Sequence, residues 1–220
     1  MKTVSDAYTT YRTMPALQKH QLRVAAVGKK LADSLECGVA VRDVVEACLF
    51  HDMGNIIKCD LEVFPEFREP EGLAHWQLVK NEFVERYGTN EHEATLAIAR
   101  ELKLKAPVVA LIDGVGFSKL KGIRDSGSLE QKIVEYADQR VGPHGVLTLD
   151  ERLQEARSRY RKRPESDMAQ HDDAFNELVG AAREIERELF AVARISPEDI
   201  TEESIQPVVE ELREYIIHFE

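Results

Sequence analysis

Apolar side chains recur along most of this chain at the three- and four-residue spacing of an amphipathic helix. One such stripe begins after Pro15 and ends near Cys37-Gly38, where glycine favours termination. Further stripes predict helices over residues 41–53, 73–87, 90–103, 107–113, 128–142, 149–161, 168–193 and 203–219. Irregular connections are expected between them, notably over 58–72, 114–127 and 163–167. No run alternates in the manner of a β-strand, so the pattern predicts an all-α protein.

The composition excludes several classes of function but does not identify the function itself. The 220 residues suffice for one sizeable core, or for one core with a short helical appendage. A net charge of −11 opposes binding to nucleic acid or to an anionic membrane, so a phosphate-bearing ligand would need a local basic patch. Three cysteines without a CxxC pair argue against a disulfide framework. No apolar run resembles a signal peptide or a spanning helix, and the cytoplasm is therefore the expected location.

Four polar side chains lie on helix faces that the pattern predicts to be buried. His20 shares a face with apolar residues three to eleven positions away in the first stripe. Asp52 continues the apolar face of the next helix, with His51 beside it, and Asp138 follows an inward valine by one turn. Buried charge is costly unless it is paired or bound to a cation. Converging imidazole and carboxylate groups therefore indicate a divalent metal site.

Each of these residues alone has a simpler explanation. A single inward histidine is more often a hydrogen-bonded core residue, and a single buried aspartate more often accepts bonds from a helix end. The chain also contains a second His-Asp pair, His171-Asp172, at the polar start of a predicted helix. We interpret that pair as capping and surface charge, so a His-Asp dipeptide by itself does not indicate a metal site.

The order of these residues along the chain resembles the HD-domain superfamily of metal-dependent phosphohydrolases. The likeness spans residues 14–160 and rests on His20, on FHDMGN with His51-Asp52, and on IVEYADQR with Asp138. It implies an HD-domain helical bundle over residues 1–165. A helical extension over 166–220 is expected to pack on that bundle or on a partner subunit, which would give a homodimer through the C-terminal helices.

The resemblance also implies the metal ligands. One divalent ion would be bound by four residues: His20, His51, Asp52 and Asp138. Some branches of the superfamily hold a second ion with two further histidines, for which His75 and His92 are the candidates here. Aromatic packing around Trp76 also explains the helix that carries His75. Mixed histidine and carboxylate ligation suits Mn, Fe, Co, Ni or Zn and does not choose among them.

The activity implied is hydrolysis of a phosphomonoester or phosphoanhydride of a small, nucleotide-like substrate by a metal-activated water. Asp52 and His51 would then be catalytic residues. The basic residues expected to bind the substrate are Lys58, Lys119, Lys121, Arg124 and Arg140. Many family members follow the His-Asp pair with Gly-Lys, whereas here Gly54 precedes Asn55 and the first lysine is Lys58.

Two other function classes fit the same residues. One is a di-iron oxygenase of the HD type that acts on a small organic substrate, which iron content and dioxygen consumption would identify. The other is a non-catalytic, nucleotide-binding regulator that has kept the fold. An Asp52→Ala variant with unchanged metal content would favour the regulator, because a metal-dependent enzyme needs that ligand.

Overall fold

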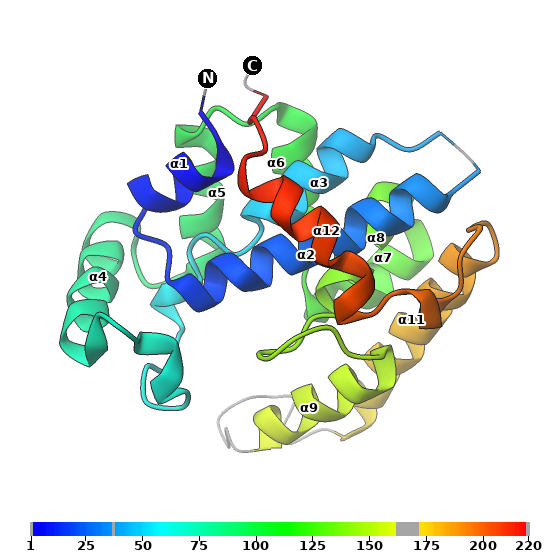
Figure 1. Cartoon of the computed structure of the whole chain (residues 1–220). Coiled ribbons are helices and arrows are strands. Elements are labelled where there is room, and N and C mark those ends of the chain that lie inside the picture. Colours follow the sequence, from blue (N-terminus) through cyan, green and yellow to red (C-terminus); the bar gives the residue numbers. More distant parts are fainter. Residues whose placement is uncertain (1, 37, 162–171, 219–220) are drawn as a thin grey trace.

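The computed structural model describes residues 2–36, 38–161 and 172–218 (Figure 1). Within these ranges the regular structure is helical, and only isolated β-bridges join single residue pairs. The all-α prediction is therefore confirmed. The α-helices are α1 (Val4–Thr10), α2 (Pro15–Ser34), α3 (Val41–Phe50), α4 (Gly72–Tyr87), α5 (Glu91–Glu101), α6 (Ala106–Gly114), α7 (Leu120–Ser126), α8 (Leu129–Asp138), α9 (Leu149–Arg161), α11 (Asp172–Phe190) and α12 (Glu202–Arg213). Short 3-10 turns are η1 (Asn55–Ile57), η2 (Pro65–Arg68), η3 (Phe117–Lys119) and η4 (Pro197–Asp199).

Several helix starts follow from local chemistry that the sequence displays. Pro15 occupies the first turn of α2, where its missing N–H costs nothing. The Asn90 side chain accepts hydrogen bonds from the first backbone N–H groups of α5. Ser128 and Gln131 form a reciprocal capping box at the start of α8. These caps fix where the helices of the candidate site begin.

Three sequence expectations were wrong or incomplete. Residues 114–127 are not an irregular loop, because Leu120 and Ile123 are buried and drive formation of η3 and α7. The helix α1 was not expected. The last helix ends at Arg213 rather than near residue 219, and the following residues pair with the N-terminal segment instead. The connection at 163–167, the domain boundary at 165–166 and His171 lie outside the described residues.

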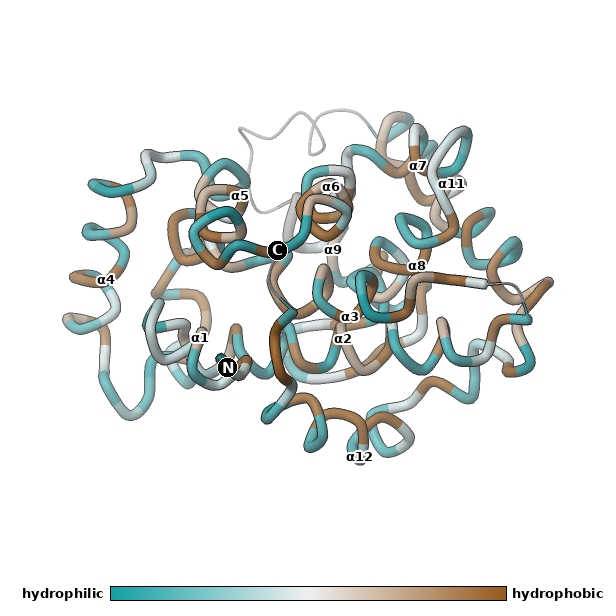
Figure 2. Tube along the Cα trace, turned by 90° about the horizontal axis from the view of Figure 1, so that it is seen from above, coloured by the Kyte–Doolittle hydropathy of each residue, from teal (hydrophilic) through white to brown (hydrophobic). Residues whose placement is uncertain are grey.

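Helix α2 lies at the centre of the fold and packs against α3, α8 and α12. Helix α3 also packs against α6 and α8, and α11 packs against α7 and α8. The C-terminal helices thus cover the helices that precede them in the same chain. Figure 2 shows apolar positions alternating with polar ones along the helices, as the amphipathic stripes require.

Close contact between α2 and α3 depends on Gly28. A Cβ atom at this position would lie 3.0 Å from Cys48 Sγ and 3.4 Å from Val44 Cγ1. The glycine therefore allows the two helices to approach closely, at a level lined by Val44, Cys48 and Ala137. This packing brings His20 on α2 towards the end of α3.

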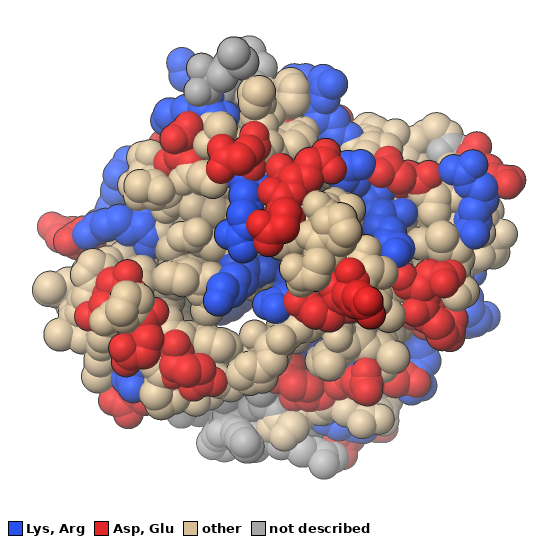
Figure 3. Space-filling view, in the orientation of Figure 1, with Lys and Arg blue, Asp and Glu red and all other residues tan. Residues whose placement is uncertain are grey.

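The surface is acidic overall but not uniformly so. In Figure 3 one face is hollowed beside the N-terminal half of α2, above the loop that leads into α9, and Lys and Arg side chains gather at the rim of this hollow. His20 belongs to that half of α2. Among the described helices, none combines the length and apolarity needed to cross a membrane.

Candidate metal centre

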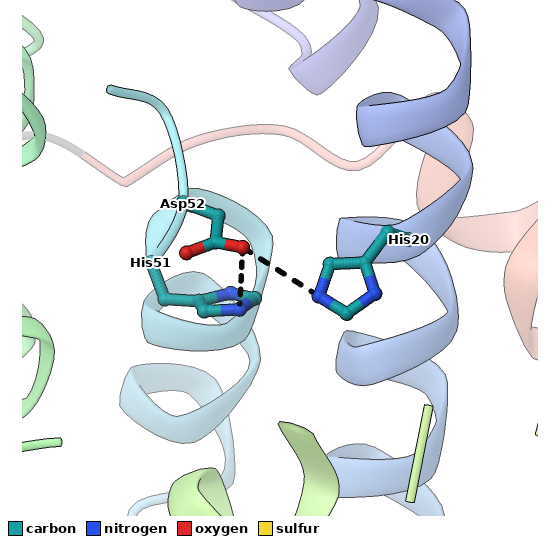
Figure 4. A group of neighbouring side chains, drawn as sticks. All are labelled: His20, His51 and Asp52. Atoms are coloured by element: carbon teal, nitrogen blue, oxygen red, sulfur yellow. Dashed lines mark ion pairs between the residues drawn. The ribbon is translucent and has the colours of Figure 1, made fainter. Parts of the chain in front are cut away.

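Three side chains from two helices converge on one point (Figure 4). His20 projects from α2, and His51 and Asp52 follow the last residue of α3. The Oδ2 atom of Asp52 lies 3.7 Å from His20 Nε2 and 3.6 Å from His51 Nε2. One potential ligand atom from each residue lies within 4.8 Å of the others. Within the described part of the chain, these three are the one group of His, Cys, Asp and Glu residues that meets this criterion.

Asp138, the last residue of α8, completes the predicted set. Its Oδ1 atom lies 3.1 Å from His20 Nε2 and 3.5 Å from His51 Nε2. Two carboxylates therefore face the same two imidazole nitrogens from different helices. The structure brings together all four residues that the HD resemblance implied as ligands of one ion.

The tautomer of His51 is fixed by the backbone. Its Nδ1 atom lies 2.8 Å from the carbonyl oxygen of Cys48, which can only accept a hydrogen bond. Nδ1 therefore carries the hydrogen, and Nε2 of the neutral ring has a free lone pair. That Nε2 atom is buried and has no hydrogen-bond partner among the described residues. A lone pair that faces carboxylates is repelled unless a proton or a cation lies between them.

The electrostatics of the cluster point the same way. Burial alone would lower the pKa of His51, but the charges of Asp52 and Asp138 outweigh it and raise the pKa to about 9. Burial would raise the pKa of Asp138, yet the contacts with His20 and His51 hold it well below the usual value. Because its pKa is raised, His51 holds a proton next to the two carboxylates, where positive charge is needed. Two imidazole nitrogens and two carboxylate oxygens form a donor set that fits a divalent transition metal.

Residues that the sequence interpretation missed hold the His-Asp turn in place. Gln21 is fully buried, and its Oε1 atom accepts a 3.4 Å hydrogen bond from Asp52 N–H. The N–H of Gly54 donates to Thr95 Oγ1 at 2.9 Å, and a Cβ atom at residue 54 would lie 2.3 Å from the carbonyl oxygen of Glu91. Gly54 therefore lets the turn sit directly on α5. The available signal was a glutamine within the apolar face of the first helix.

Glu135 is a second buried carboxylate on α8, one turn before Asp138. It accepts hydrogen bonds from Gly116 N–H at 2.6 Å and from Gln139 Nε2 at 3.1 Å. Burial and the nearby charge of Asp138 raise the pKa of Glu135 to about 7. Its position between apolar residues in IVEYAD was a signal that the sequence interpretation did not use.

The two candidate ligands for a second ion lie in other contacts. His75 stands edge-on against Trp76, with ring centroids 4.8 Å apart. His92 Nε2 lies 3.0 Å from Asp113 Oδ1 on α6. Neither histidine belongs to the converging group of described residues at His51. The second-metal interpretation therefore gains no support from this arrangement.

Lys58 is the basic residue that the structure links to the cluster. Burial would lower the pKa of Lys58, but the carboxylates of Asp52 and Glu91, with a smaller effect from Asp138, raise it. Its Nζ atom lies 3.1 Å from Glu91 Oε1, and half of its side chain is exposed. Lys58 also lines a shallow cleft of about 700 Å³ formed with Leu73 and other residues of 59–62 and α4.

The other predicted basic residues make contacts with the protein itself. Lys119 Nζ donates to the carbonyl oxygen of Asp113. Lys121 pairs with Glu177 at 2.6 Å, and Arg124 reaches Glu184 at 3.2 Å, both on α11. These pairs belong to the interface of α7 with α11. Substrate binding by the three residues stays a prediction.

Arg140 has a different place from the one we expected. It is 2% exposed, and its guanidinium donates to the carbonyl oxygens of Leu147, Pro197 and Ile200 and to the Tyr136 hydroxyl. Its donors are therefore directed at the protein rather than at a ligand. Burial of an arginine requires such partners, and two of them, the carbonyls of Pro197 and Ile200, come from a segment far from residue 140 in the sequence.

Comparison with known proteins agrees with the fold and the cluster. The HD domain family model matches residues 17–139, which is more than half of the chain. The helical fold and the histidine–aspartate cluster place the protein in a superfamily of metal-dependent hydrolases. The chain belongs to the HD-domain family. No curated protein and no solved structure matches it.

Proposed function

We propose that this protein is a metal-dependent phosphohydrolase that cleaves a phosphomonoester or phosphoanhydride of a small, nucleotide-like substrate. The observation that carries the proposal is the convergence of His20, His51, Asp52 and Asp138, with nitrogen-to-oxygen distances of 3.1–3.7 Å. Membership of the HD-domain family supports hydrolysis as the reaction class.

The residues of the cluster suit this chemistry. His20, His51, Asp52 and Asp138 would hold the ion, and the Cys48 carbonyl keeps His51 in the tautomer that can ligate. A bound divalent ion supplies Lewis acidity, lowering the pKa of a coordinated water to near 7 and polarising the phosphoryl group. Asp52, whose side chain keeps about a fifth of its surface exposed, would accept a hydrogen bond from the attacking water and orient it. Lys58 would bind a phosphate oxygen, because nearby carboxylates keep it protonated.

The direct test is a screen of phosphorylated metabolites with the purified protein. Each of Mn, Fe, Co, Ni and Zn is added in turn, phosphate release is followed, and bound metal is determined by elemental analysis. We expect release from at least one nucleotide-like ester and a loss of both metal and activity in His51→Ala. The matched control is His218→Ala, which removes an imidazole that contacts Glu46 instead of the cluster and should keep the metal.

The same preparations separate the other function classes. Iron binding with dioxygen consumption and no phosphate release would contradict the proposal in favour of an oxygenase, although neither His75 nor His92 joins the cluster. Nucleotide binding without turnover under any metal would favour a regulator. A homodimer through the C-terminal helices stays a prediction, which light scattering of the purified protein tests.

A further inference from the structure

Three aromatic rings meet where two distant segments approach each other. Phe64 and Phe67, on either side of the first residues of η2, stack with ring centroids 4.9 Å apart. His144, from the loop before α9, contacts both rings at 5.7 and 5.6 Å. The phenyl rings are half-buried and His144 is exposed. This ring cluster of Phe64, Phe67 and His144 thus lies at the surface rather than in the core.

The loop that carries His144 is held rigidly. Gly142 N–H donates to the carbonyl oxygen of Gly145 at 2.8 Å, and Gly145 has a φ of +157°, a conformation that favours glycine. The buried Arg140 donates to the Leu147 carbonyl, and Val146 N–H donates to Glu202 of α12 at 3.0 Å. These contacts explain why a buried arginine follows α8. They fix His144 at the tip of a short, well-supported turn.

Both arms of the ring cluster start at metal-ligand helices. The chain reaches Phe64 after leaving the end of α3 at His51-Asp52, and it reaches His144 six residues after Asp138 at the end of α8. From Arg140 to the tip of the loop is at most about 14 Å of extended chain. Figures 1 and 3 show this loop along the edge of the hollow beside the half of α2 that carries His20. The loop that carries His144 therefore lies at the edge of this hollow, on the side of the molecule where the N-terminal half of α2 carries His20.

The hollow combines two kinds of recognition that one small molecule can use at once. Basic side chains at its rim, and Lys58 near the carboxylates, suit a phosphate. Partly exposed aromatic rings suit a planar ring, because stacking accepts any base and excludes water from both partners.

We propose that Phe64, Phe67 and His144 form the subsite for the planar heteroaromatic ring of the substrate's leaving group, while the cluster holds its phosphate. This inference rests on the proposed function and extends it to specificity. The ring cluster selects nucleotides over phosphate esters of the same charge that lack a ring. It positions the substrate without contacting the reacting atoms.

The test compares two phosphomonoesters with the metal-bound enzyme. AMP carries a ring, and glycerol 2-phosphate carries none. For Phe67→Leu and Phe64→Leu we expect KM for AMP to rise about tenfold while kcat and all constants for glycerol 2-phosphate stay unchanged. Phe67→Tyr keeps the ring and should keep the low KM. The matched control is Phe190→Leu, which removes a half-buried ring that packs on Tyr136.

Other outcomes would overturn the inference. Equal losses for both esters, or a lower melting temperature that explains the loss, would make the rings a structural contact only. An unchanged KM for AMP in the Phe64 and Phe67 variants would show that the rings take no part in substrate recognition. A rise in KM for AMP in Leu73→Ala but not in Phe67→Leu would place the ring in the cleft beside Lys58 instead.

Calorimetric titration with adenosine tests the ring subsite without catalysis. Binding that is lost in Phe67→Leu and kept in Phe190→Leu supports the subsite even if the protein releases phosphate from no compound of the screen, an outcome that would contradict the proposed function alone. Absence of adenosine binding to the wild-type protein would contradict the subsite.

Discussion

Helix α3 carries two imidazole–carboxylate clusters, one at its end and one in its middle. In the middle, the fully buried Glu46 receives hydrogen bonds at Oε1 from His218 Nδ1 at 2.8 Å, from His218 N–H at 3.0 Å and from the Tyr215 hydroxyl at 3.3 Å. At the end, Asp52 and Asp138 face the Nε2 atoms of two histidines, and that of His51 has no hydrogen-bond partner among the described residues.

The difference lies in the balance of donors and acceptors. At Glu46 the Oε1 atom meets three protein donors, which attach the C-terminal segment to α3, although Oε2 is buried and has no hydrogen-bond partner among the described residues. At His51 acceptors face a ligand-ready nitrogen, and the arrangement needs positive charge from outside. The same residue types thus form an anchor in one place and a candidate metal centre in the other. Four predictions test this contrast, from the largest expected effect to the smallest.

Asp138→Asn should have the largest effect, because it removes a charged ligand while keeping the shape of the side chain. We expect metal affinity and phosphate release to fall by more than about a hundredfold, a loss larger than that usual for indirect partners of a metal. Elemental analysis and turnover measure the change. Unchanged metal content would show that Asp138 is only a neighbour of the ion.

The metal-free protein should lose stability as the pH rises. The pKa of His51 is raised from 6.5 to about 9, so its contribution is fully present below pH 6.5 and disappears as the pH passes about 9. The free energy of unfolding should fall by up to about 3 kcal/mol over that window. Urea titrations at pH 6.5 and 9.5 in the presence of chelator measure it. His51→Ala should abolish this part of the slope, and an unaltered slope would assign it to other groups.

Glu46→Gln should weaken the anchor and leave the metal centre unchanged. Hydrogen bonds to a charged acceptor contribute more than those to an amide, so the free energy of unfolding should fall by about 1–3 kcal/mol. Chemical denaturation gives the stability, and elemental analysis gives the metal content. A variant that loses its metal as well would show that the two clusters on α3 are coupled.

Tyr215→Phe should produce the smallest effect. Its hydroxyl makes the longest of the three bonds to Glu46, and the fold loses about 0.5–1 kcal/mol when such a bond is removed. Thermal unfolding of Tyr215→Phe and of Glu46→Gln under the same conditions provides the comparison. A loss as large as that of Glu46→Gln would mean that the hydroxyl, rather than His218, is the main partner of the carboxylate.

The sequence was most informative where contacts are local. Pro15, Asn90 and Ser128 marked helix starts correctly, and helical spacing placed His20 and Asp138 on faces that meet. Contacts between distant segments were not predictable in this way. The burial of Arg140 depends on carbonyls at Pro197 and Ile200, so from sequence alone an arginine near Asp138 suggested substrate binding.

The short helix α7 shows a second reason why the sequence analysis was incomplete. Glycines and charges around Leu120 and Ile123 favoured a loop, while burial of those two side chains against α11 favours a helix. The anchor at Glu46 was missed because its partners are the last described residues of the chain. Nothing in the spacing of α3 indicates that Tyr215 and His218 return to it.

The hydrogen bond from His51 to the Cys48 carbonyl has a consequence for variation. Every amino acid at position 48 supplies that carbonyl. The tautomer of His51 therefore depends on the backbone of α3 and not on any side chain. Exchanges at 48 that preserve the helix end will leave it intact. A change that disrupts the last turn of α3 would alter it while every ligand residue remained, so such a chain could keep the whole histidine–aspartate signature and still bind no ion.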